Sequence, residues 1–261
     1  MRIVTLIENT TCREDLCCEH GLSLYIETND HRILFDAGQT DAFADNAKKL
    51  GINLAKVDFA VLSHGLYDHG GGLKRFLEIN KTAPVYVSRN AFMPHYNGSE
   101  KYIGLDERLL DIPRFVFAEN TTQIAPGITL ESGSIPLPHP IDPAGLTLLE
   151  SGGLHPEDFR HEQYLIIEED GKRFCFSGCS HRGILNIAAH FRPDVLIGGF
   201  HFMKLTPQTD ARRLTDSAQE LLQHPTVYYT GHCTGTAAYD FMKPIMGTQL
   251  NAITTGSVIK V

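Results

Sequence analysis

Short runs of alternating hydrophobic and polar residues, separated by polar turns, dominate the first third of the chain. Strands are predicted over residues 2–7, 22–28, 31–35 and 57–63, and helices over residues 40–52 and 71–80. Asn29 and Asp30 form the expected hairpin turn between two of these strands. Thr40 or Asp41 can cap the start of the first helix, and Gly51 can end it.

The middle of the chain has a different pattern. Nine of the thirteen prolines lie between Pro84 and Pro156, among short polar stretches. This density of prolines favours long loops and short strands, and it predicts a loop-rich insertion over about residues 90–160. Such a segment is expected to extend from the main fold and to determine substrate specificity. The alternative is that it forms a lid over a site.

Strands and helices alternate again in the last hundred residues. Strands are predicted over 163–169, 172–178, 193–200, 226–232 and 252–261, and helices over 182–191, 209–224 and 236–246. Strands followed by interleaved helices, twice in one chain, predict an α/β fold whose two similar halves pack sheet against sheet with the helices outside. At 261 residues, we expect a single domain over residues 1–261.

Composition and charge narrow the functional classes. Hydrophobic residues make up 42% of the chain and charged residues 21%, which is ordinary for a soluble globular protein. The net charge of -8 argues against nucleic-acid binding through a broad basic face, but a small anionic substrate remains compatible because a bound metal reverses the local charge. The sequence has no secretory signal and no apolar run near the roughly 20 residues that span a bilayer, so we expect a cytoplasmic protein without membrane contact. Its oligomeric state does not follow from the sequence.

Four predicted strands end in a glycine-containing turn that carries His, Asp or Cys. These turns hold Asp36; His64, Asp68 and His69; Cys179 and His181; and His232 and Cys233. The carboxyl ends of strands are where sites assemble in α/β proteins, so the four turns can meet. Imidazole, carboxylate and thiolate groups suit zinc, iron or manganese. One isolated histidine is weak evidence for metal binding, whereas four strand ends that each carry such residues predict a metal site.

The turn at residues 63–72, SHGLYDHGGG, is the densest of the four. Its glycines let the backbone fold closely, and the adjacent Asp68 and His69 can approach one metal from two directions in a non-helical turn. The helix that follows directs its first amides toward this region, where they favour a negative group. A helix N-cap is the alternative role for Asp68.

Together, the segments LFDAG, SHGLYDHGGGL, GCSH and GHCTG resemble the metallo-β-lactamase fold superfamily. More narrowly, ENTT, EHGLSLYIE, GCSHRGILNI, IGGFH and GHCTG resemble its dihydropterin-ribofuranosylaminobenzene-phosphate synthase-like branch of metal-dependent hydrolases. The likeness covers nearly the whole chain and is weakest in the proline-rich middle. It implies a four-layer αββα sandwich of mixed sheets with a mono- or dinuclear site at one edge. It also implies a metal-activated water that attacks an ester or phosphoester, or a reaction on a phosphorylated pterin-type substrate.

The resemblance assigns roles to individual residues. His64 matches the first histidine of the family motif H-x-H-x-D-H, and Asp68 and His69 match its last two positions. His232 matches the last histidine, which joins Asp68 and His69 at the second metal position. Asp36 matches an aspartate that hydrogen-bonds the ligands.

Three residues compete to complete the first metal position beside His64. Cys179 stands where many superfamily members have a metal-bridging aspartate, and a thiolate is a suitable replacement. His181 is particular to this branch and is the expected imidazole ligand. His161 lies near the superfamily's isolated histidine, so the sequence leaves all three open.

Leu66 departs from the family motif, because it replaces a ligand histidine with a side chain that has no donor atom. The first position is therefore expected to bind metal weakly. The second position keeps three protein ligands and an open vertex, as catalytic zinc sites do. We expect Asp68 and His69 to be catalytic residues of a site for one or two ions, with Zn²⁺ preferred and Mn²⁺ or Fe²⁺ as alternatives. Water bound to such an ion has its pKa lowered from its bulk value to about 7.

Two further side chains are candidates for substrate contact. Tyr67 lies between Leu66 and Asp68, and His201 ends a predicted strand at the same edge. Packing is the alternative role for Tyr67, and structural hydrogen bonding is the alternative for His201. Three more residues flank the loop after the first strand, which borders the site in this fold: Glu8, Asn9 and His20.

Three functional hypotheses follow. The first is a metallohydrolase with one firm and one weak metal position, acting on a small, anionic substrate. The second is a ligand-binding protein of the same fold without catalytic activity, because Leu66 replaces the paired metal-ligand histidine. The third is a diiron redox protein, although that branch has a Glu at the position of Leu66 and a fused flavodoxin, and neither is present.

Overall fold

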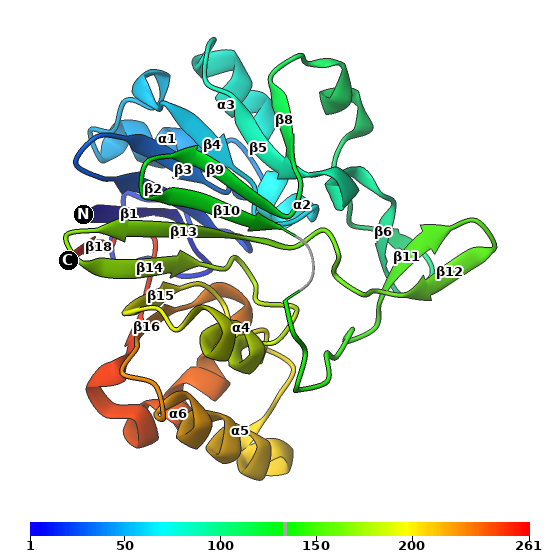
Figure 1. The fold of residues 1–261 in the computed structure, drawn as a ribbon, viewed down its shortest axis with the longest axis vertical. Coiled ribbons are helices and arrows are strands. Elements are labelled where there is room, and N and C mark those ends of the chain that lie inside the picture. Colours follow the sequence, from blue (N-terminus) through cyan, green and yellow to red (C-terminus); the bar gives the residue numbers. More distant parts are fainter. Residues whose placement is uncertain (133–134) are drawn as a thin grey trace.

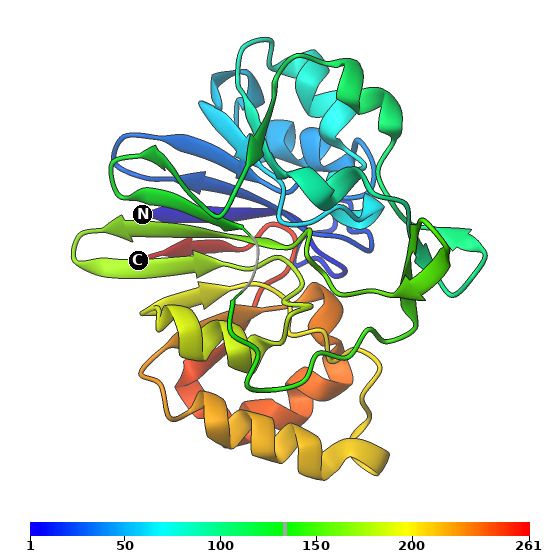
Figure 2. The same cartoon turned by 45° about the vertical axis from the view of Figure 1, so that its right-hand side comes forward.

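Two seven-stranded sheets lie face to face, and helices cover the outer face of each, as Figures 1 and 2 show. The computed structural model describes residues 1–132 and 135–261. Within these residues, no helix is both long enough and apolar enough to cross a membrane. The layered α/β fold predicted from the sequence is confirmed.

The first sheet comes mainly from the N-terminal half and has the strand order β18-β1-β2-β3-β4-β5-β8. Its strands are β1 (Arg2–Ile7), β2 (Ser23–Glu27), β3 (Arg32–Phe35), β4 (Phe59–Val61), β5 (Val85–Ser88), β8 (Phe115–Ala118) and β18 (Val258–Lys260). The pairs from β18 to β3 are antiparallel, whereas those from β3 to β8 are parallel. Two helices cover its outer face, α1 (Ala42–Lys49) and α3 (Leu73–Ile79).

The second sheet repeats this arrangement in the C-terminal half, in the order β17-β16-β15-β14-β13-β10-β9. Its strands are β9 (Thr121–Ala125), β10 (Ile128–Ser132), β13 (Gln163–Glu169), β14 (Lys172–Phe176), β15 (Val195–Ile197), β16 (Val227–Thr230) and β17 (Leu250–Ala252). The pairs from β14 to β17 are parallel. Its outer face carries α4 (Ile184–Phe191), α5 (Pro207–Leu221) and α6 (Thr236–Met246).

Apolar side chains fill all three spaces between the layers. Phe43 and Phe76 lie between the first sheet and its helices, and Met242 lies between the second sheet and α6. Between the sheets, the rings of Phe35 and Phe176 approach to 5.7 Å. Full burial of each such side chain contributes about 1.5–3 kcal/mol, so the two halves form one packed scaffold at this interface.

The loop at residues 63–72 differs from the predicted non-helical turn. Residues Tyr67–Gly70 form the single helical turn α2, which precedes α3. A Cβ atom added at Gly72 would lie 2.2 Å from the carbonyl oxygen of Ala37, so only glycine lets the start of α3 pack against the segment after β3. The predicted caps of α1 are partly confirmed: the hydroxyl of Thr40 accepts from the Ala42 amide and Gly51 follows the helix, but the Asp41 side chain caps nothing.

The predicted closing strand 252–261 is wrong as one element. It divides into β17, which belongs to the second sheet, and β18, which crosses to the first sheet and pairs with β1. The chain turns between them at Gly256, whose φ of +93° suits glycine, and Ser257 donates its amide to the carbonyl of Thr254. This crossing joins the two sheets at one end.

The proline-rich middle contributes a separate four-stranded sheet beside the sandwich (Figure 2). In sheet order, its strands are β12 (Gly153–Pro156), β11 (Leu146–Glu150), β6 (His95–Asn97) and β7 (Lys101–Tyr102). The predicted insertion over about residues 90–160 is too broad, because β8, β9 and β10 belong to the two main sheets. Residues 133–134 of that stretch lie outside the described residues.

Candidate metal centre

Side chains from both halves of the chain gather at the edge where the parallel strands end. They come from the turn after β3, the loop that leads into α2, and the turns after β14, β15 and β16. They comprise Asp36, His64, Asp68, His69, Cys179, His181, His201, His232 and Cys233. The four turns singled out in the sequence therefore meet.

His69 is held from behind by Asp36. The Nδ1 atom of His69 lies 2.7 Å from Oδ2 of Asp36, and both groups are fully buried. The same carboxylate accepts the amide and the hydroxyl of Ser63, each at 2.7 Å. Because the carboxylate only accepts, Nδ1 of His69 carries a proton, and Nε2 is the ring nitrogen that faces the site. Asp36 thus lies where the resemblance placed it.

His232 is oriented in the same way by the segment after β1. Its Nδ1 lies 2.9 Å from Oδ1 of Asn9, and its backbone amide donates to Glu8 at 2.6 Å. The Nε2 atoms of His232 and His69 face each other at 3.1 Å. Oδ2 of Asp68 lies 3.4 Å from Nε2 of His232 and 3.8 Å from Nε2 of His69. Asp68, His69 and His232 are called position 2 below.

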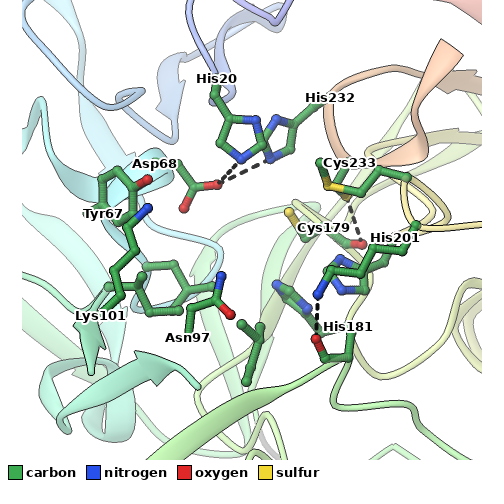
Figure 3. Close-up of a pocket in the computed structure, with 16 residues that line it drawn as sticks. His20, Tyr67, Asp68, Asn97, Lys101, Cys179, His181, His201, His232 and Cys233 are labelled. Carbon is green, nitrogen blue, oxygen red and sulfur yellow. Dashed lines mark hydrogen bonds and ion pairs between the residues drawn. The ribbon is translucent and has the colours of Figure 1, made fainter. Parts of the chain in front are cut away.

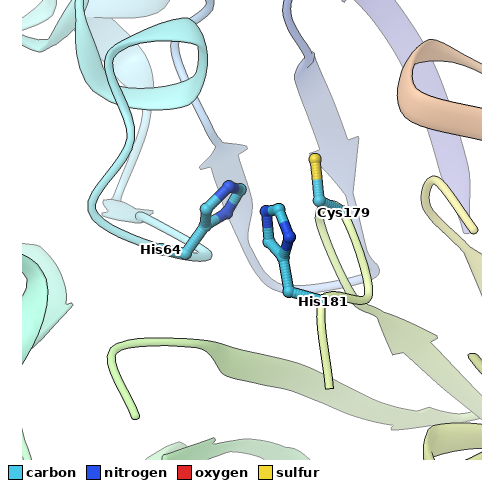
Figure 4. A group of neighbouring side chains, drawn as sticks. All are labelled: His64, Cys179 and His181. Carbon is cyan, nitrogen blue, oxygen red and sulfur yellow. The ribbon is translucent and has the colours of Figure 1, made fainter. Parts of the chain in front are cut away.

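A second group, position 1, consists of His64, Cys179 and His181, and Figure 4 shows the three side chains next to one another. One ligand atom from each lies within 4.8 Å of those from the other two. Nδ1 of His64 contacts the hydroxyl of Ser63 at 2.7 Å, but its Nε2 has no partner among the described residues, and neither do the two ring nitrogens of His181. The Sγ of Cys179 also lies 3.1 Å from Nε2 of His69, so this thiol stands between the two positions.

His161 does not join either position. Its Nδ1 accepts the amide of Gly65 at 2.8 Å, and its ring stacks on His95 at a centroid distance of 4.0 Å. Its ring centroid is 5.9 Å from that of His64. Of the three alternatives left open by the sequence, the structure therefore brings Cys179 and His181 to His64 and leaves His161 as a support of the Gly65 backbone.

Leu66 is buried at the end of the loop and lines the cavity above the metal-binding groups. Its side chain brings a methyl surface where the family motif has an imidazole. Position 1 is left with two imidazoles and the shared thiol of Cys179.

The local charges favour the ligand forms of Asp68, His64 and His181, whereas His69 holds a second proton at neutral pH until a cation displaces it. Burial opposes protonation of His69, but Asp36 and Asp68 outweigh it and raise the pKa of the imidazole to about 9. Burial would raise the pKa of Asp68, yet His69 and His232 lower it, so the group stays a carboxylate. Burial and then the surrounding histidines lower the pKa of His64 and of His181, which keeps both rings neutral with a free lone pair.

A cavity of about 220 Å³ opens above the metal-binding groups (Figure 3). Both predicted substrate-contact residues, Tyr67 and His201, line it. Lys101 and Lys204 also line it, and the ammonium of Lys101 lies 5.6 Å from the ring centroid of Tyr67. Two cationic side chains therefore line the cavity although the chain has a net charge of -8.

Several residues of the site carry no sequence signal. Asn97 and Lys101 line the cavity from the four-stranded sheet, whose sequence has no motif. Glu162 is fully buried and accepts the backbone amides of His181 and Arg182 at 2.7 and 3.0 Å, which fixes the GCSH turn. Burial raises the pKa of Glu162 to about 7. The positions of Asn97, Lys101 and Glu162 at the site are visible only in the folded structure.

Comparisons with known proteins agree with this arrangement. A family model described as the metallo-beta-lactamase superfamily matches residues 18–232. An uncharacterized protein of Methanocaldococcus jannaschii, MJ0448, is 30% identical and covers 99% of this chain and 98% of its own length. A protein of the same organism named 7,8-dihydropterin-6-methyl-4-(beta-D-ribofuranosyl)-aminobenzene-5'-phosphate synthase is 29% identical over 93% of this chain and 90% of its own. The solved structure of Tm1679, described as a metal-dependent hydrolase of the beta-lactamase superfamily, matches with a TM-score of 0.86 and 28% identity over 100% of this chain and 99% of that chain.

Proposed function

Since the chain belongs to the metallo-beta-lactamase superfamily, we propose that it is a metal-dependent hydrolase that cleaves a phosphoester bond in a small anionic substrate. The observation that carries this proposal is the opposed pair of Nε2 atoms of His69 and His232, 3.1 Å apart beside the carboxylate of Asp68. Two ring nitrogens at this distance share either a proton or a metal ion, and the carboxylate beside them offers a metal ion a third ligand.

The donor set fits a divalent metal. Position 2 offers two imidazoles whose far nitrogens are fixed by Asp36 and Asn9, and one carboxylate. Position 1 offers buried ring nitrogens that have no other partner among the described residues, and an unpaired buried nitrogen is costly. Imidazole, carboxylate and thiolate together suit Zn²⁺, with Fe²⁺ or Mn²⁺ as alternatives, and two positions allow one or two ions. When bound, such an ion polarises a phosphoryl or carbonyl oxygen and supplies hydroxide near neutral pH.

The chain's own residues bind and orient the substrate around that centre. Asp68 and His69 fix position 2 at the base of the cavity, so a substrate there lies within reach of Tyr67 and His201. The ammonium of Lys101 provides positive charge in the cavity lining, which favours a phosphate over a neutral ester. The relative named as a dihydropterin-type 5'-phosphate synthase extends the proposal to phosphorylated pterin-type substrates.

Metal content and hydrolysis measured together test this proposal. The protein is freed of metal, loaded with Zn²⁺, Mn²⁺ or Fe²⁺, and assayed on bis(p-nitrophenyl) phosphate while bound metal is counted by emission spectrometry. We expect about one tightly bound ion per chain and hydrolysis that disappears in His69→Ala. His190→Ala, an exposed histidine on α4, is the matched control and should behave as wild type. A protein that holds no metal, or that holds it and never hydrolyses a phosphoester, would overturn the proposal.

Leu66 favours one second candidate, a ligand-binding protein that has lost turnover. Its buried side chain lines the cavity and gives position 1 no third imidazole. Under this alternative, Leu66→His gains hydrolysis that the natural chain lacks. Activity in the natural chain would exclude it.

A further inference from the structure

We infer that His20 is a catalytic residue that donates a hydrogen bond from Nε2 to an anionic oxygen of the substrate, and that it is not a metal ligand. The inference rests on the proposed hydrolase function. His20 lies between β1 and β2 and lines the cavity, with its ring 4.7 Å from that of His232 (Figure 3). Its Nε2 is 3.4 Å from Oδ2 of Asp68, and 42% of its side chain is exposed. A substrate can therefore reach it from the solvent side.

Spacing alone would make His20 a ligand, because its ring nitrogen groups with His232 and the Asp68 carboxylate within 4.8 Å. The position of its proton decides between the two roles. A ring nitrogen that carries a proton has no lone pair for a metal, whereas one that lacks a proton cannot donate a hydrogen bond. The contacts of the opposite ring nitrogen, Nδ1, fix which case holds.

The amide of Asn9 makes those contacts, and the backbone fixes its orientation. Oδ1 of Asn9 accepts the amide of Gly21 at 3.3 Å, and Nδ2 donates to the carbonyl of His232 at 3.5 Å. A backbone amide only donates and a backbone carbonyl only accepts, so oxygen and nitrogen cannot be exchanged without losing both bonds. The same Nδ2 lies 3.3 Å from Nδ1 of His20, and the same Oδ1 lies 2.9 Å from Nδ1 of His232.

One amide thus gives two neighbouring histidines opposite tautomers. Nδ1 of His20 accepts from Asn9, so the proton of the neutral ring is on Nε2 and faces the cavity. Nδ1 of His232 donates to Asn9, so its Nε2 has a lone pair that faces the metal position. His232 is a ligand and His20 is a donor.

The donor is free to act on a substrate. Its distance of 3.4 Å to Asp68 is long for a hydrogen bond to a carboxylate, so the N–H is weakly engaged. A phosphoester at position 2 gathers negative charge on its non-bridging oxygens as it reacts, and a fixed donor aimed at such an oxygen stabilises the transition state more than the ground state. Loss of one such donor lowers kcat by about 100- to 1000-fold in a buried site, and we expect about 10- to 100-fold here because His20 is partly exposed.

Two substitutions separate the atoms of the ring. Gln places an amide nitrogen near the position of Nε2, whereas Asn reproduces the Nδ1 side and leaves the cavity without a donor. We expect His20→Ala and His20→Asn to lower kcat on bis(p-nitrophenyl) phosphate about 10- to 100-fold with little change in KM, and His20→Gln to recover much of the loss. Bound zinc should stay at the wild-type level in all three. Measurable hydrolysis by the wild type that is equally fast in His20→Ala, or loss of zinc from His20→Ala, would overturn the inference.

Two further measurements keep this inference separate from the hydrolase proposal. Long-range ¹H–¹⁵N spectra of the zinc-loaded protein should show the proton of His20 on Nε2 and that of His232 on Nδ1. Calorimetric binding of inorganic phosphate should weaken at least fivefold in His20→Ala and His20→Asn, and recover in His20→Gln. If the wild type hydrolyses nothing but gives these spectra and affinities, the hydrolase proposal fails and the donor role stands. The opposite tautomer, or unchanged phosphate affinity, overturns the donor role whatever the activity.

Discussion

His69 and His232 direct their Nε2 atoms at each other across 3.1 Å, while Asp36 and Asn9 occupy the far side of the two rings. Nδ1 of each ring is thereby engaged, and Nε2 is the atom that would meet a metal ion. The two halves of the chain supply one ring each, and a proton between the two Nε2 atoms links them at neutral pH because the pKa of His69 is raised to about 9. A cation at position 2 would displace that proton and bind both rings, so folding and metal binding would be coupled and metal binding would release a proton.

Removal of metal should lower stability. A ligand that binds only the folded protein adds about 4 kcal/mol when its free concentration is a thousand times Kd. We therefore expect EDTA treatment to lower Tm by several degrees and Zn²⁺ to restore it, as measured by scanning calorimetry. A Tm that does not respond to either treatment would contradict the coupling.

The two positions should respond differently to loss of a histidine. His69→Ala removes a ligand of position 2 and is expected to abolish tight metal binding, whereas His64→Ala only weakens occupancy of position 1. Metal content after dialysis measures both variants, and His190→Ala on the outside of α4 is the control. Equal loss in the two variants would show that the positions are not independent.

Asp36→Asn should weaken metal binding although Asp36 is not itself a candidate ligand, because it acts through Nδ1 of His69. At position 36, Oδ1 must accept the amide of Ser63, so an asparagine would place its NH₂ group toward Nδ1 of His69. His69 would then carry its proton on Nε2 and lose the lone pair that the metal needs. We expect a loss of about 10- to 100-fold in zinc affinity, measured by competition with a chelating dye. Asp41→Asn, on an exposed side chain, should leave the affinity unchanged.

Leu66→His should add a ligand to position 1. The side chain lines the cavity, and the new imidazole would join the pair of His64 and His181. We expect bound metal to rise from about one toward two ions per chain in the same competition experiment. Leu66→Ile keeps the volume and the apolar character, so it should stay at the wild-type value.

Gly72→Ala should lower both the stability of the fold and the affinity of the candidate metal centre for metal. The added methyl group would meet the carbonyl of Ala37 at 2.2 Å, and the Ala37 amide donates to the carbonyl of His69 at 2.7 Å. A clash of this kind costs about 1–3 kcal/mol, so urea unfolding should shift to lower concentration together with a loss of metal affinity. Gly51→Asn is the control: no atom lies within 4 Å of its added Cβ, so its only cost is the φ of +73°, and it should lower stability slightly while leaving metal affinity unchanged.

The sequence pointed to the candidate ligands because they follow short apolar strands, and a strand end can be recognised from neighbouring residues alone. Asp36, His64 and His232 each come within a few residues of a strand end, so periodicity places them at one edge of the fold. The choice among Cys179, His181 and His161 was not local. It depends on the amide of Gly65, which takes Nδ1 of His161 and turns that ring away from the centre.

The rest of the site depends on packing between segments distant in sequence. Lys101 reaches the cavity only because the four-stranded sheet lies beside the sandwich. The crossing from β17 to β18 depends on a turn at Gly256, which lies in the polar run TTGS that the single strand predicted over residues 252–261 passed over. The helical turn at Tyr67–Gly70 is too short to show a period.

The side-chain amide of Asn9 has a consequence for how this chemistry could change. Aspartate at that position would have the same shape but no N–H, so it could only accept from Nδ1 of His20. His20 would then move its proton to Nδ1 and present a bare nitrogen beside Asp68, and the pocket would gain a ligand and lose a donor. Exchange of one nitrogen for one oxygen, remote from the bond that breaks, would thus convert one kind of reactive centre into another while the fold stays the same.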